Sequence, residues 1–240
     1  MIRQITSASN QLIKELIKLK SVKERKKQNK FIVEGEDLVS FCYENKMVEF
    51  IISSKEHEEF DCDQIIVPPF ILEKISFNKS VPSIMALSFF KEEDRPLGDR
   101  IIYLDGVQDP GNVGTIIRTA LAFNYTSVVL SSDSASKYND KTIMATKGAI
   151  FALPIFDNVS LSNLKNQGYT IISSALKDSI DYKGVETGNK FVIVIGNEGQ
   201  GIKEETFKIS DKIVKIDIQN IDSLNVAIAG AILMNEYRKE

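Results

Sequence analysis

The sequence predicts an α/β protein in two parts: a small N-terminal α/β module and a larger C-terminal domain built on a parallel sheet. Three observations support this fold class. Segments of strand length alternate with helical segments throughout residues 101–240, which is typical of parallel sheets covered by helices on both faces. Residues 91–100 are mostly charged and contain Pro96 and Gly98, which indicates a linker. Residues 1–90 carry a separate set of strand and helix patterns.

The N-terminal module, residues 1–90, begins with an amphipathic segment whose apolar residues recur at near-helical spacing. We expect this helix to start after Ser9-Asn10, which are common N-cap types, and to end near Gln28. The remaining expected elements are a strand at 31–33, a helix at 37–44, strands at 48–53 and 63–67, a helix from Pro68 to about 75, and a strand at 84–89.

The C-terminal domain, residues 101–240, shows β-branched apolar runs that indicate buried strands. The expected strands are 101–104, 127–130, 170–174, 191–195 and 213–216, and the expected helices are 112–123, 139–147, 161–167 and 225–238. Ligands of such sheets bind at the carboxyl ends of the strands. The loops that follow these strands are therefore the places to search for a site.

The composition is that of an ordinary globular protein, with 240 residues, 43% hydrophobic residues and 26% charged residues. Cys42 and Cys62 lack the spacing of metal ligands or of a disulfide framework, so we expect no metal. No apolar run approaches the ~20 residues of a membrane span, and the N-terminus lacks a signal-peptide hydrophobic stretch. We therefore expect a cytoplasmic protein with no membrane partner, and we expect His57, within an acidic run, to lie at the surface.

The formal net charge of −3 hides an asymmetry, because residues 1–30 hold nine basic and only two acidic residues. Local positive charge binds polyanions even on an acidic protein. The candidate RNA-binding residues are Lys23, Arg25, Lys26 and Lys27. The alternative is a solvated helix face with no binding role.

The first candidate loop follows the strand at 101–104 and leads into a helix. Asn112 lies near the start of that helix, where its amide can cap the helix or bind a ligand. Arg118 stands among apolar neighbours, and a guanidinium in such a place usually has an anionic partner. A structural ion pair is the alternative to a catalytic role.

The second candidate loop is glycine-rich and runs from Gly196 to Gly201 with Glu198 inside it. Glycines allow the backbone to approach a ligand closely, although a tight turn would also explain them. The loop lacks the Lys-Ser/Thr pair of a phosphate loop and the spacing of a dinucleotide fingerprint. The third candidate, Ser223-Leu224-Asn225, precedes the last helix, and we expect Ser223 to be its N-cap.

Taken together, these motifs resemble those of a known family. Asn112-x-Gly114-x-x-x-Arg118, Gly196-x-Glu198-x-x-Gly201 and Ser223-Leu224-Asn225-Val226-Ala227 resemble, in order and spacing, the three motifs of the SpoU/TrmH family of RNA 2′-O-ribose methyltransferases, which belong to the SPOUT class. Residues 1–90 resemble the L30-like substrate-binding domain of the family's two-domain members, typical of those acting on ribosomal RNA.

The resemblance implies a deep trefoil knot in the C-terminal segment, S-adenosylmethionine as cofactor, and a homodimer whose site draws on both subunits. It implies cofactor contacts, mostly through backbone groups, from Ser174, Ala175, Gly196, Asn197, Gly201, Ile216, Ile218 and Leu224.

The resemblance also implies catalytic roles. Arg118 would be the catalytic arginine, Asn112 would position it or the ribose, and Glu198 would anchor its loop or orient Arg118. Ser223 and Asn225 would complete the site. Because a neutral guanidine is costly, Arg118 is expected to clamp a phosphate and stabilise the developing alkoxide while another group takes the proton.

Two other functions remain open from the sequence. A non-catalytic RNA-binding or ribosome-assembly protein on the same fold would use the same basic N-terminus, but it would not need Asn112, Arg118 and Glu198. A different nucleotide-binding α/β enzyme is disfavoured by the missing phosphate-loop and dinucleotide patterns. Among RNA substrates, the N-terminal module favours ribosomal RNA over transfer RNA by analogy alone.

Overall fold

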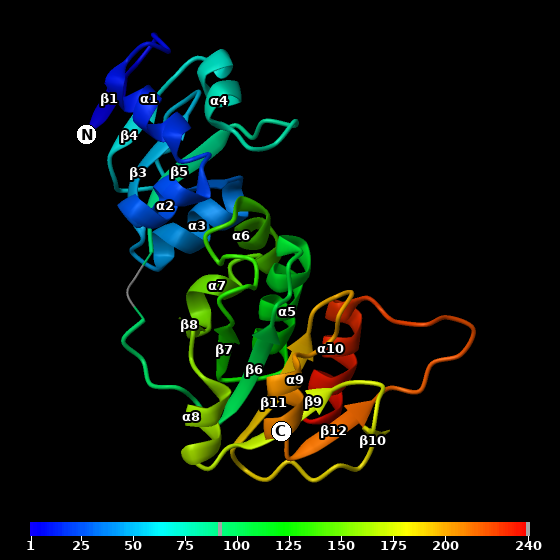
Figure 1. Cartoon of the computed structure of the whole chain (residues 1–240). Coiled ribbons are helices and arrows are strands. Elements are labelled where there is room, and N and C mark those ends of the chain that lie inside the picture. The colour runs from blue at the N-terminus through cyan, green and yellow to red at the C-terminus, as the bar shows by residue number, and fades with distance from the viewer. Residues whose placement is uncertain (91–92, 239–240) are drawn as a thin grey trace. The chain divides into compact units, whose positions relative to one another are not determined.

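A computed structural model describes residues 1–90 and 93–238, and the chain forms two compact units, Met1–Glu92 and Glu93–Glu240 (Figure 1). Residues 91–92 of the expected linker lie outside the described residues. The rest of that segment belongs to the second unit: Arg95 donates to the Ala152 carbonyl at 2.8 Å and the Gly98 amide donates to Ser127 at 3.0 Å.

The N-terminal unit is a five-stranded mixed sheet with helices on both faces, in the strand order β1-β4-β3-β5-β2. Strand β3 pairs in parallel with β4, and β5 pairs antiparallel with both β3 and β2. The strands are β1 (Ile2–Gln4), β2 (Lys30–Glu34), β3 (Val48–Ser53), β4 (Gln64–Ile66) and β5 (Ile84–Phe89), and the helices are α1 (Gln11–Lys18), α2 (Val22–Gln28), α3 (Glu36–Glu44) and α4 (Pro69–Ile75).

Two expectations for this unit are wrong, and one strand was missed. The single helix expected from residue 10 to 28 is two helices, α1 and α2, although its start is confirmed because Asn10 caps α1. Strand β1 was not predicted, because all three of its residues are exposed and give no alternating pattern. His57 is buried rather than at the surface: the Gln64 side chain bonds both the His57 amide and its carbonyl, and this holds the loop inward.

The C-terminal unit is a seven-stranded sheet in the order β10-β12-β9-β11-β6-β7-β8, and every pair is parallel. The expected parallel α/β fold is confirmed. Its strands are β6 (Arg100–Asp105), β7 (Ser127–Leu130), β8 (Ile155–Asp157), β9 (Thr170–Ser174), β10 (Ile180–Asp181), β11 (Phe191–Gly196) and β12 (Lys212–Lys215). Its helices are α5 (Pro110–Ala122), α6 (Asp140–Thr146), α7 (Ala149–Ala152), α8 (Leu161–Asn166), α9 (Glu204–Ile209) and α10 (Val226–Glu236).

Helices cover the two faces of this sheet in separate groups. Helices α5 and α10 pack against each other, and α10 packs on β11, whereas α8 and α9 pack together on β9 (Figure 1). Gly114 lets α6 approach α5 closely, since an added Cβ there would stand 2.6 Å from Ala145 Cβ. The short elements β8, β10 and α7 were not predicted, because each has only two to four residues and shows no periodicity.

Candidate active site

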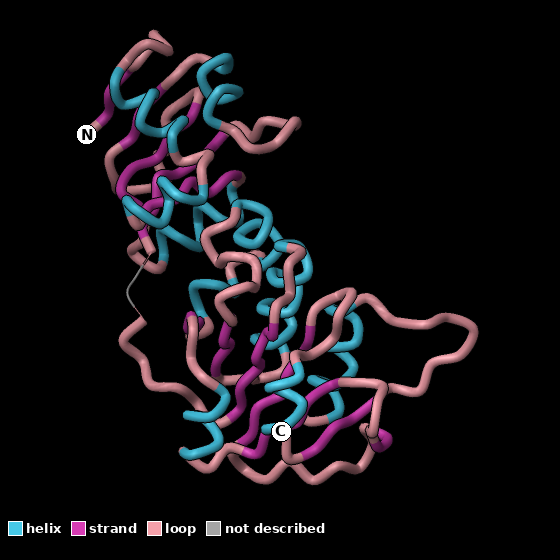
Figure 2. The backbone as a smooth tube through the Cα atoms, viewed as in Figure 1, coloured by secondary structure: helices cyan, strands magenta, loops and turns pink. Residues whose placement is uncertain are grey.

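The three sequence motifs meet at the carboxyl ends of the parallel strands. Strand β6 leads into α5, β11 leads into the glycine-rich loop, and a long loop joins β12 to α10 (Figure 2). In the register of the sheet Gly196 is the partner of Asp105, so the first two motifs start side by side. Parallel strands therefore bring together residues that lie about ninety positions apart in the chain.

A chain of side-chain hydrogen bonds joins one residue from each motif. The Asn112 amide nitrogen donates to a Glu198 carboxylate oxygen at 3.1 Å. The Asn225 amide nitrogen donates to the Asn112 amide oxygen, also at 3.1 Å. Asn112 is thus the central link, with its donor and its acceptor both engaged.

Glu198 anchors the glycine-rich loop to the first motif. Its carboxylate accepts from the backbone amides of Gln108 and Asp109, both at 3.1 Å, in addition to Asn112. Burial works to raise the Glu198 pKa, but the hydrogen bonds from Asn112, Gln108 and Asp109 outweigh it and hold the pKa below its ordinary value. A carboxylate held in this way is ionised at neutral pH and is a poor proton acceptor.

The glycine-rich loop is folded back on itself by Asn197 and Gly201, whose backbone groups pair in both directions at 2.8 and 3.0 Å. The Asn197 side chain donates to the Gly106 carbonyl at 2.8 Å and accepts from the Gly199 amide at 2.9 Å. An added Cβ at Gly196 would stand 2.3 Å from the Gly201 backbone, so this turn requires glycine. Hydrogen bonds within the chain therefore hold the loop in this shape.

A cavity of about 510 Å³ lies between this loop and the loop that precedes α10. Small-molecule sites typically measure ~300–1,000 Å³. The cavity is lined by Glu198, by Ser223, and by every residue expected to contact the cofactor, namely Ser174, Ala175, Gly196, Asn197, Gly201, Ile216, Ile218 and Leu224. We call it the cofactor cavity.

The chemistry of the cofactor cavity fits a ligand that carries a positive charge beside apolar groups. Glu198, Glu204 and Asp222 line it against two lysines, Lys177 and Lys215, so acidic groups are in excess. Apolar walls come from Ile195, Ile202, Ile216, Ile218 and Leu224. S-adenosylmethionine combines a sulfonium cation with an adenine ring, and both parts find suitable surroundings here.

Two expectations about helix starts are corrected by the geometry. Ser223 is not the N-cap of α10, because Asn225 holds that position and its side-chain oxygen accepts from the Ala227 and Ile228 amides. Asn112 does not cap α5 either: Asp109 is the N-cap and accepts from the Asn112 amide at 2.8 Å. The sequence signal for Asp109 was present, since an N-cap residue followed by proline at the first helical position is a common helix start.

Arg118 lies apart from this network. It is exposed on α5, and within residues 1–90 and 93–238 it has no hydrogen bond or ion pair. The expected anionic partner is therefore not supplied by the described part of its own chain. Glu198 bonds Asn112 and two backbone amides rather than Arg118, so of the two expected roles the structure supports loop anchoring.

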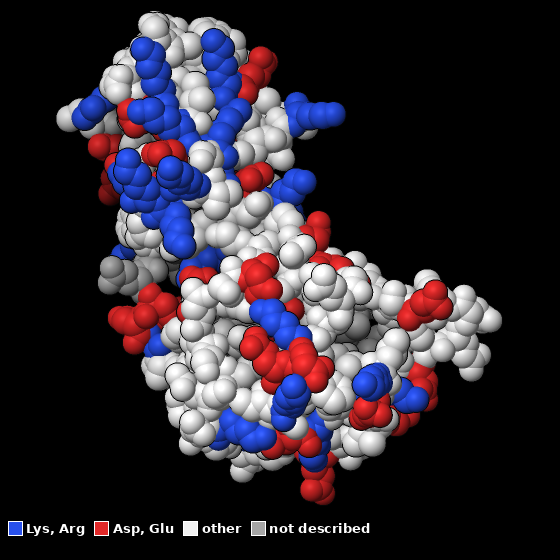
Figure 3. All heavy atoms as spheres, in the orientation of Figure 1, with Lys and Arg blue, Asp and Glu red and all other residues white. Residues whose placement is uncertain are grey.

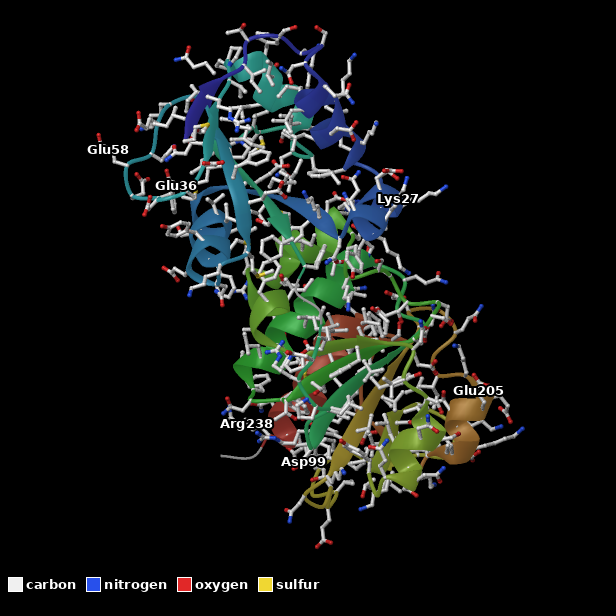
Figure 4. The ribbon with its side chains drawn as sticks, turned by 90° about the vertical axis from the view of Figure 1, so that its left-hand side faces the viewer. Lys27, Glu36, Glu58, Asp99, Glu205 and Arg238 are labelled. Carbon is white, nitrogen blue, oxygen red and sulfur yellow. The ribbon has the colours of Figure 1, made fainter. Side chains whose placement is uncertain are left out.

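Lysine and arginine side chains gather over α1 and α2 on the N-terminal unit (Figure 3). Lys23, Lys26 and Lys27 are exposed, and Lys27 extends from α2 into solvent (Figure 4). Arg25 differs from them and corrects the expected RNA-binding set: its guanidinium is 1% exposed, donates to the Leu19 carbonyl at 2.9 Å and stacks over the Phe77 ring at 5.2 Å. Arg25 therefore holds the corner between α1 and α2, and the lysines form the surface.

Comparison with known proteins identifies the family. Residues 99–235, more than half of the chain, match the model of the SpoU rRNA Methylase family. The chain belongs to this family. Residues 10–86 match the model of the MRM3-like substrate binding domain. The family expected from the three motifs is thereby confirmed, and with it RNA methyltransferase activity that uses S-adenosylmethionine.

The relatives of this SpoU family member include full-length matches. The 23S rRNA (guanosine(2553)-2′-O)-methyltransferase RlmP of Bacillus subtilis (strain 168) is 31% identical, with 98% of this chain and 99% of that protein covered. The AdoMet-bound rRNA methyltransferase from Sinorhizobium meliloti superimposes with a TM-score of 0.86 at 25% identity, covering 98% and 97% of the two chains. The AdoMet complex of the SpoU methyltransferase AviRb from Streptomyces viridochromogenes shares the fold, with a TM-score of 0.83 at 21% identity over 95% and 96%.

Proposed function

We propose that this protein methylates the ribose 2′-hydroxyl of a nucleotide in 23S ribosomal RNA. The observation that carries the proposal is the hydrogen-bond chain Glu198–Asn112–Asn225, which joins the three family motifs beside the cofactor cavity. The Bacillus subtilis relative, similar over nearly its whole length, is named for guanosine 2553 of 23S rRNA. The corresponding guanosine is the first nucleotide to test.

The cofactor cavity is proposed to hold S-adenosylmethionine through the backbone of Gly196, Ile216 and Leu224, with Ser174 and Ala175 at its other wall. The cofactor supplies an electrophilic methyl group on sulfur. The protein's share is to exclude water and to fix the approach of the ribose. Such positioning can contribute on the order of 7–11 kcal/mol in favourable cases.

Arg118 is proposed to bind a phosphate of the target and to stabilise the negative charge that develops on the 2′-oxygen. A free guanidinium on an exposed helix face is suited to a bidentate contact with phosphate. The low pKa of Glu198, set by its hydrogen bonds against the effect of burial, makes that carboxylate an unsuitable proton acceptor. The proton of the 2′-hydroxyl is therefore proposed to pass to a phosphate oxygen or to water.

A homodimer is proposed to complete the site. Helices α5 and α10 lie side by side in the same direction, because Asn112 contacts Asn225 near their starts and the Tyr125 hydroxyl donates to the Met234 carbonyl near their ends. On α10 the residues Ile228, Ala231 and Ile232 share the face that is not buried, and Ile228 is 53% exposed. A second copy covering this face would bring its own Arg118 toward the network.

We also propose that the C-terminal segment forms a trefoil knot and that the protein acts in the cytoplasm. The family fold and the order β10-β12-β9, in which the later strand β12 lies between two strands that precede it in the chain, support a knot in the C-terminal segment. Among the described residues no helix is long and apolar enough to cross a membrane. We propose that the protein acts in the cytoplasm, because ribosomal RNA is modified there.

Mapping of ribose methylation tests the proposed substrate. 23S rRNA from cells with and without this protein is compared, and one 2′-O-methyl position is expected to disappear with the protein and to return after incubation with purified enzyme and S-adenosylmethionine. Loss of a methyl group from transfer RNA instead would establish the alternative substrate. Calorimetry that showed no S-adenosylmethionine binding at high micromolar concentration would favour a non-catalytic RNA-binding protein.

A further inference from the structure

A second cavity, of about 350 Å³, opens at the carboxyl edge of the same sheet, on the face covered by α8 and α9. Tyr103 near the end of β6, Ser132 after β7 and Asn158 after β8 contribute polar groups to it. Leu161 of α8 and Ile209 of α9 contribute apolar walls. We call this the polar cavity.

Helix α9 separates the polar cavity from the cofactor cavity. Glu204 and Phe207 line the cofactor cavity, whereas Thr206 and Ile209 line the polar cavity. Three strand spacings of about 4.8 Å separate β12 from β6 in the sheet, a distance on the order of 14 Å. A few nucleotides of an RNA strand can span that distance, so one substrate can occupy both places.

Tyr103 is the feature of the polar cavity that points to a ligand. The residue is 8% exposed, and its ring packs in an apolar cluster with Ile101, Val129 and Val192. Its hydroxyl makes no hydrogen bond to any described residue, and the side chain lines the cavity. A hydroxyl that lines a cavity and has no partner among the described residues can bond a molecule that enters the cavity.

The charges around the polar cavity argue against a phosphate or another anion as its ligand. Lys203 is its one lysine, and its ammonium group is shared between Asp105 at 3.3 Å and Asp133 at 2.9 Å. Asp105 is buried and further fixed by the Thr206 hydroxyl at 2.7 Å. Glu205, on α9 (Figure 4), adds a third carboxylate among the residues that line the cavity.

A neutral ring with polar edges suits these surroundings. Hydroxyls of Tyr103 and Ser132 and the amide of Asn158 offer donors and acceptors, while Leu161 and Ile209 offer surface for a flat apolar face. We propose that the polar cavity binds one unpaired base of the RNA substrate, a few nucleotides from the methylated ribose. This inference rests on the proposed function, because it needs RNA at the carboxyl edge of the sheet.

Three variants test the polar cavity, and they range from the loss of one polar group to the filling of the cavity. Tyr103→Phe removes only the hydroxyl, Asn158→Gly removes the amide while keeping the positive φ of 60° at that position, and Ser132→Trp fills the cavity. The matched control is Tyr169→Phe, since Tyr169 belongs to the same apolar cluster but its hydroxyl bonds the Gly98 carbonyl outside the cavity.

The expected result is a change in RNA recognition alone. The KM and the equilibrium Kd for ribosomal RNA rise roughly 2- to 10-fold in Tyr103→Phe and Asn158→Gly, the range set by one hydrogen bond. They rise further in Ser132→Trp. The kcat and the Kd for S-adenosylmethionine stay near wild type, and Tyr169→Phe binds RNA as the wild type does.

A protein–RNA double-mutant cycle then locates the base. Each base near the target is replaced in turn by an abasic nucleotide. At one position the loss is expected to weaken binding to the wild type but not to Ser132→Trp. Fully additive losses at every position, or unchanged RNA Kd in all three variants, would overturn the inference. If the wild type methylated no ribosomal RNA, the proposed function would fail, while the RNA Kd values would still decide this inference.

Discussion

Two regions of the C-terminal unit differ in whether their side chains find partners within the same chain. Around the cofactor cavity, Glu198, Asn112 and Asn225 satisfy one another and the neighbouring backbone within one chain. On the outer face of α5 and α10, Arg118 has no partner among the described residues, and Ile228 is more than half exposed. This difference supports our proposal that a single chain forms the cofactor half of the site and that a second copy and RNA complete the face that carries Arg118.

The largest effect on activity is expected from substitution of Arg118. Arg118→Ala is expected to lower kcat by about 10²–10³-fold, because one group that stabilises developing charge is lost. The Kd for S-adenosylmethionine should stay within about twofold of wild type, since Arg118 is not among the residues that line the cofactor cavity. Single-turnover methylation and calorimetry measure the two quantities. Near-normal turnover of Arg118→Lys would contradict a fork-shaped phosphate clamp.

Mixing two inactive variants tests whether Arg118 acts at the cofactor cavity of its own chain or of the partner. Ala175→Trp fills the cofactor cavity but leaves Arg118 in place, and Arg118→Ala does the reverse. If Arg118 serves the partner's cavity, equal co-expression gives half heterodimers with one intact site each, or about a quarter of wild-type activity in a two-fold dimer. If Arg118 serves its own cavity, the mixture stays inactive, and isolation of tagged heterodimers distinguishes this result from failed mixing.

The apolar outer face is tested at Ile228. Ile228→Glu places a charge where the proposed dimer excludes water, so the dimer dissociation constant should rise by about 10-fold or more, with activity falling at low protein concentration. Sedimentation measures the mass. Ile180→Glu is the control, because Ile180 is similarly exposed at 56% but lies on β10. Equal effects of the two substitutions would remove the support for this interface.

Helix α2 of the N-terminal unit carries both exposed basic residues, Lys23, Lys26 and Lys27, and a buried one, Arg25. Reversing Lys23, Lys26 and Lys27 to glutamate should weaken RNA binding and flatten the dependence of log Kd on log salt, because phosphate contacts release counterions. Cofactor binding should not change. Arg25→Gln should instead lower the melting temperature, since the Arg25 guanidinium is buried and bonded to the Leu19 carbonyl. An unchanged salt slope in the triple variant would show that these lysines are only solvated.

The smallest effect is expected at Glu198. Its pKa is lowered by hydrogen bonds that outweigh burial, so the carboxylate stabilises the fold above its unfolded pKa of about 4.3, and this contribution is lost as pH falls through the lower folded pKa. Glu198→Gln should therefore cost less than about 1 kcal/mol at pH 7, because solvent screens the group. The melting temperatures of the two proteins should converge as the pH falls through the folded-state pKa of Glu198, and a constant gap would rule out this linkage.

The sequence by itself determined the parallel α/β architecture of residues 101–240 and the three motifs, because β-branched runs, helical periodicity and glycine spacing are local properties. It predicted the strands at 127–130 and 170–174 with the observed limits. It also identified Asn112, Glu198 and Asn225, and every residue expected to contact the cofactor lines one cavity.

Only the tertiary structure decided the roles within those motifs. The N-cap of α10 is Asn225 rather than Ser223, and the N-cap of α5 is Asp109 rather than Asn112. These assignments depend on backbone geometry, which composition does not reveal. Arg25 is buried with the Phe77 ring from a distant part of the chain against its guanidinium, and His57 is buried with its backbone bonded to the Gln64 side chain. For Arg118, the sequence motif indicated a functional role. Only the folded chain shows that its guanidinium has no hydrogen bond or ion pair with the described residues.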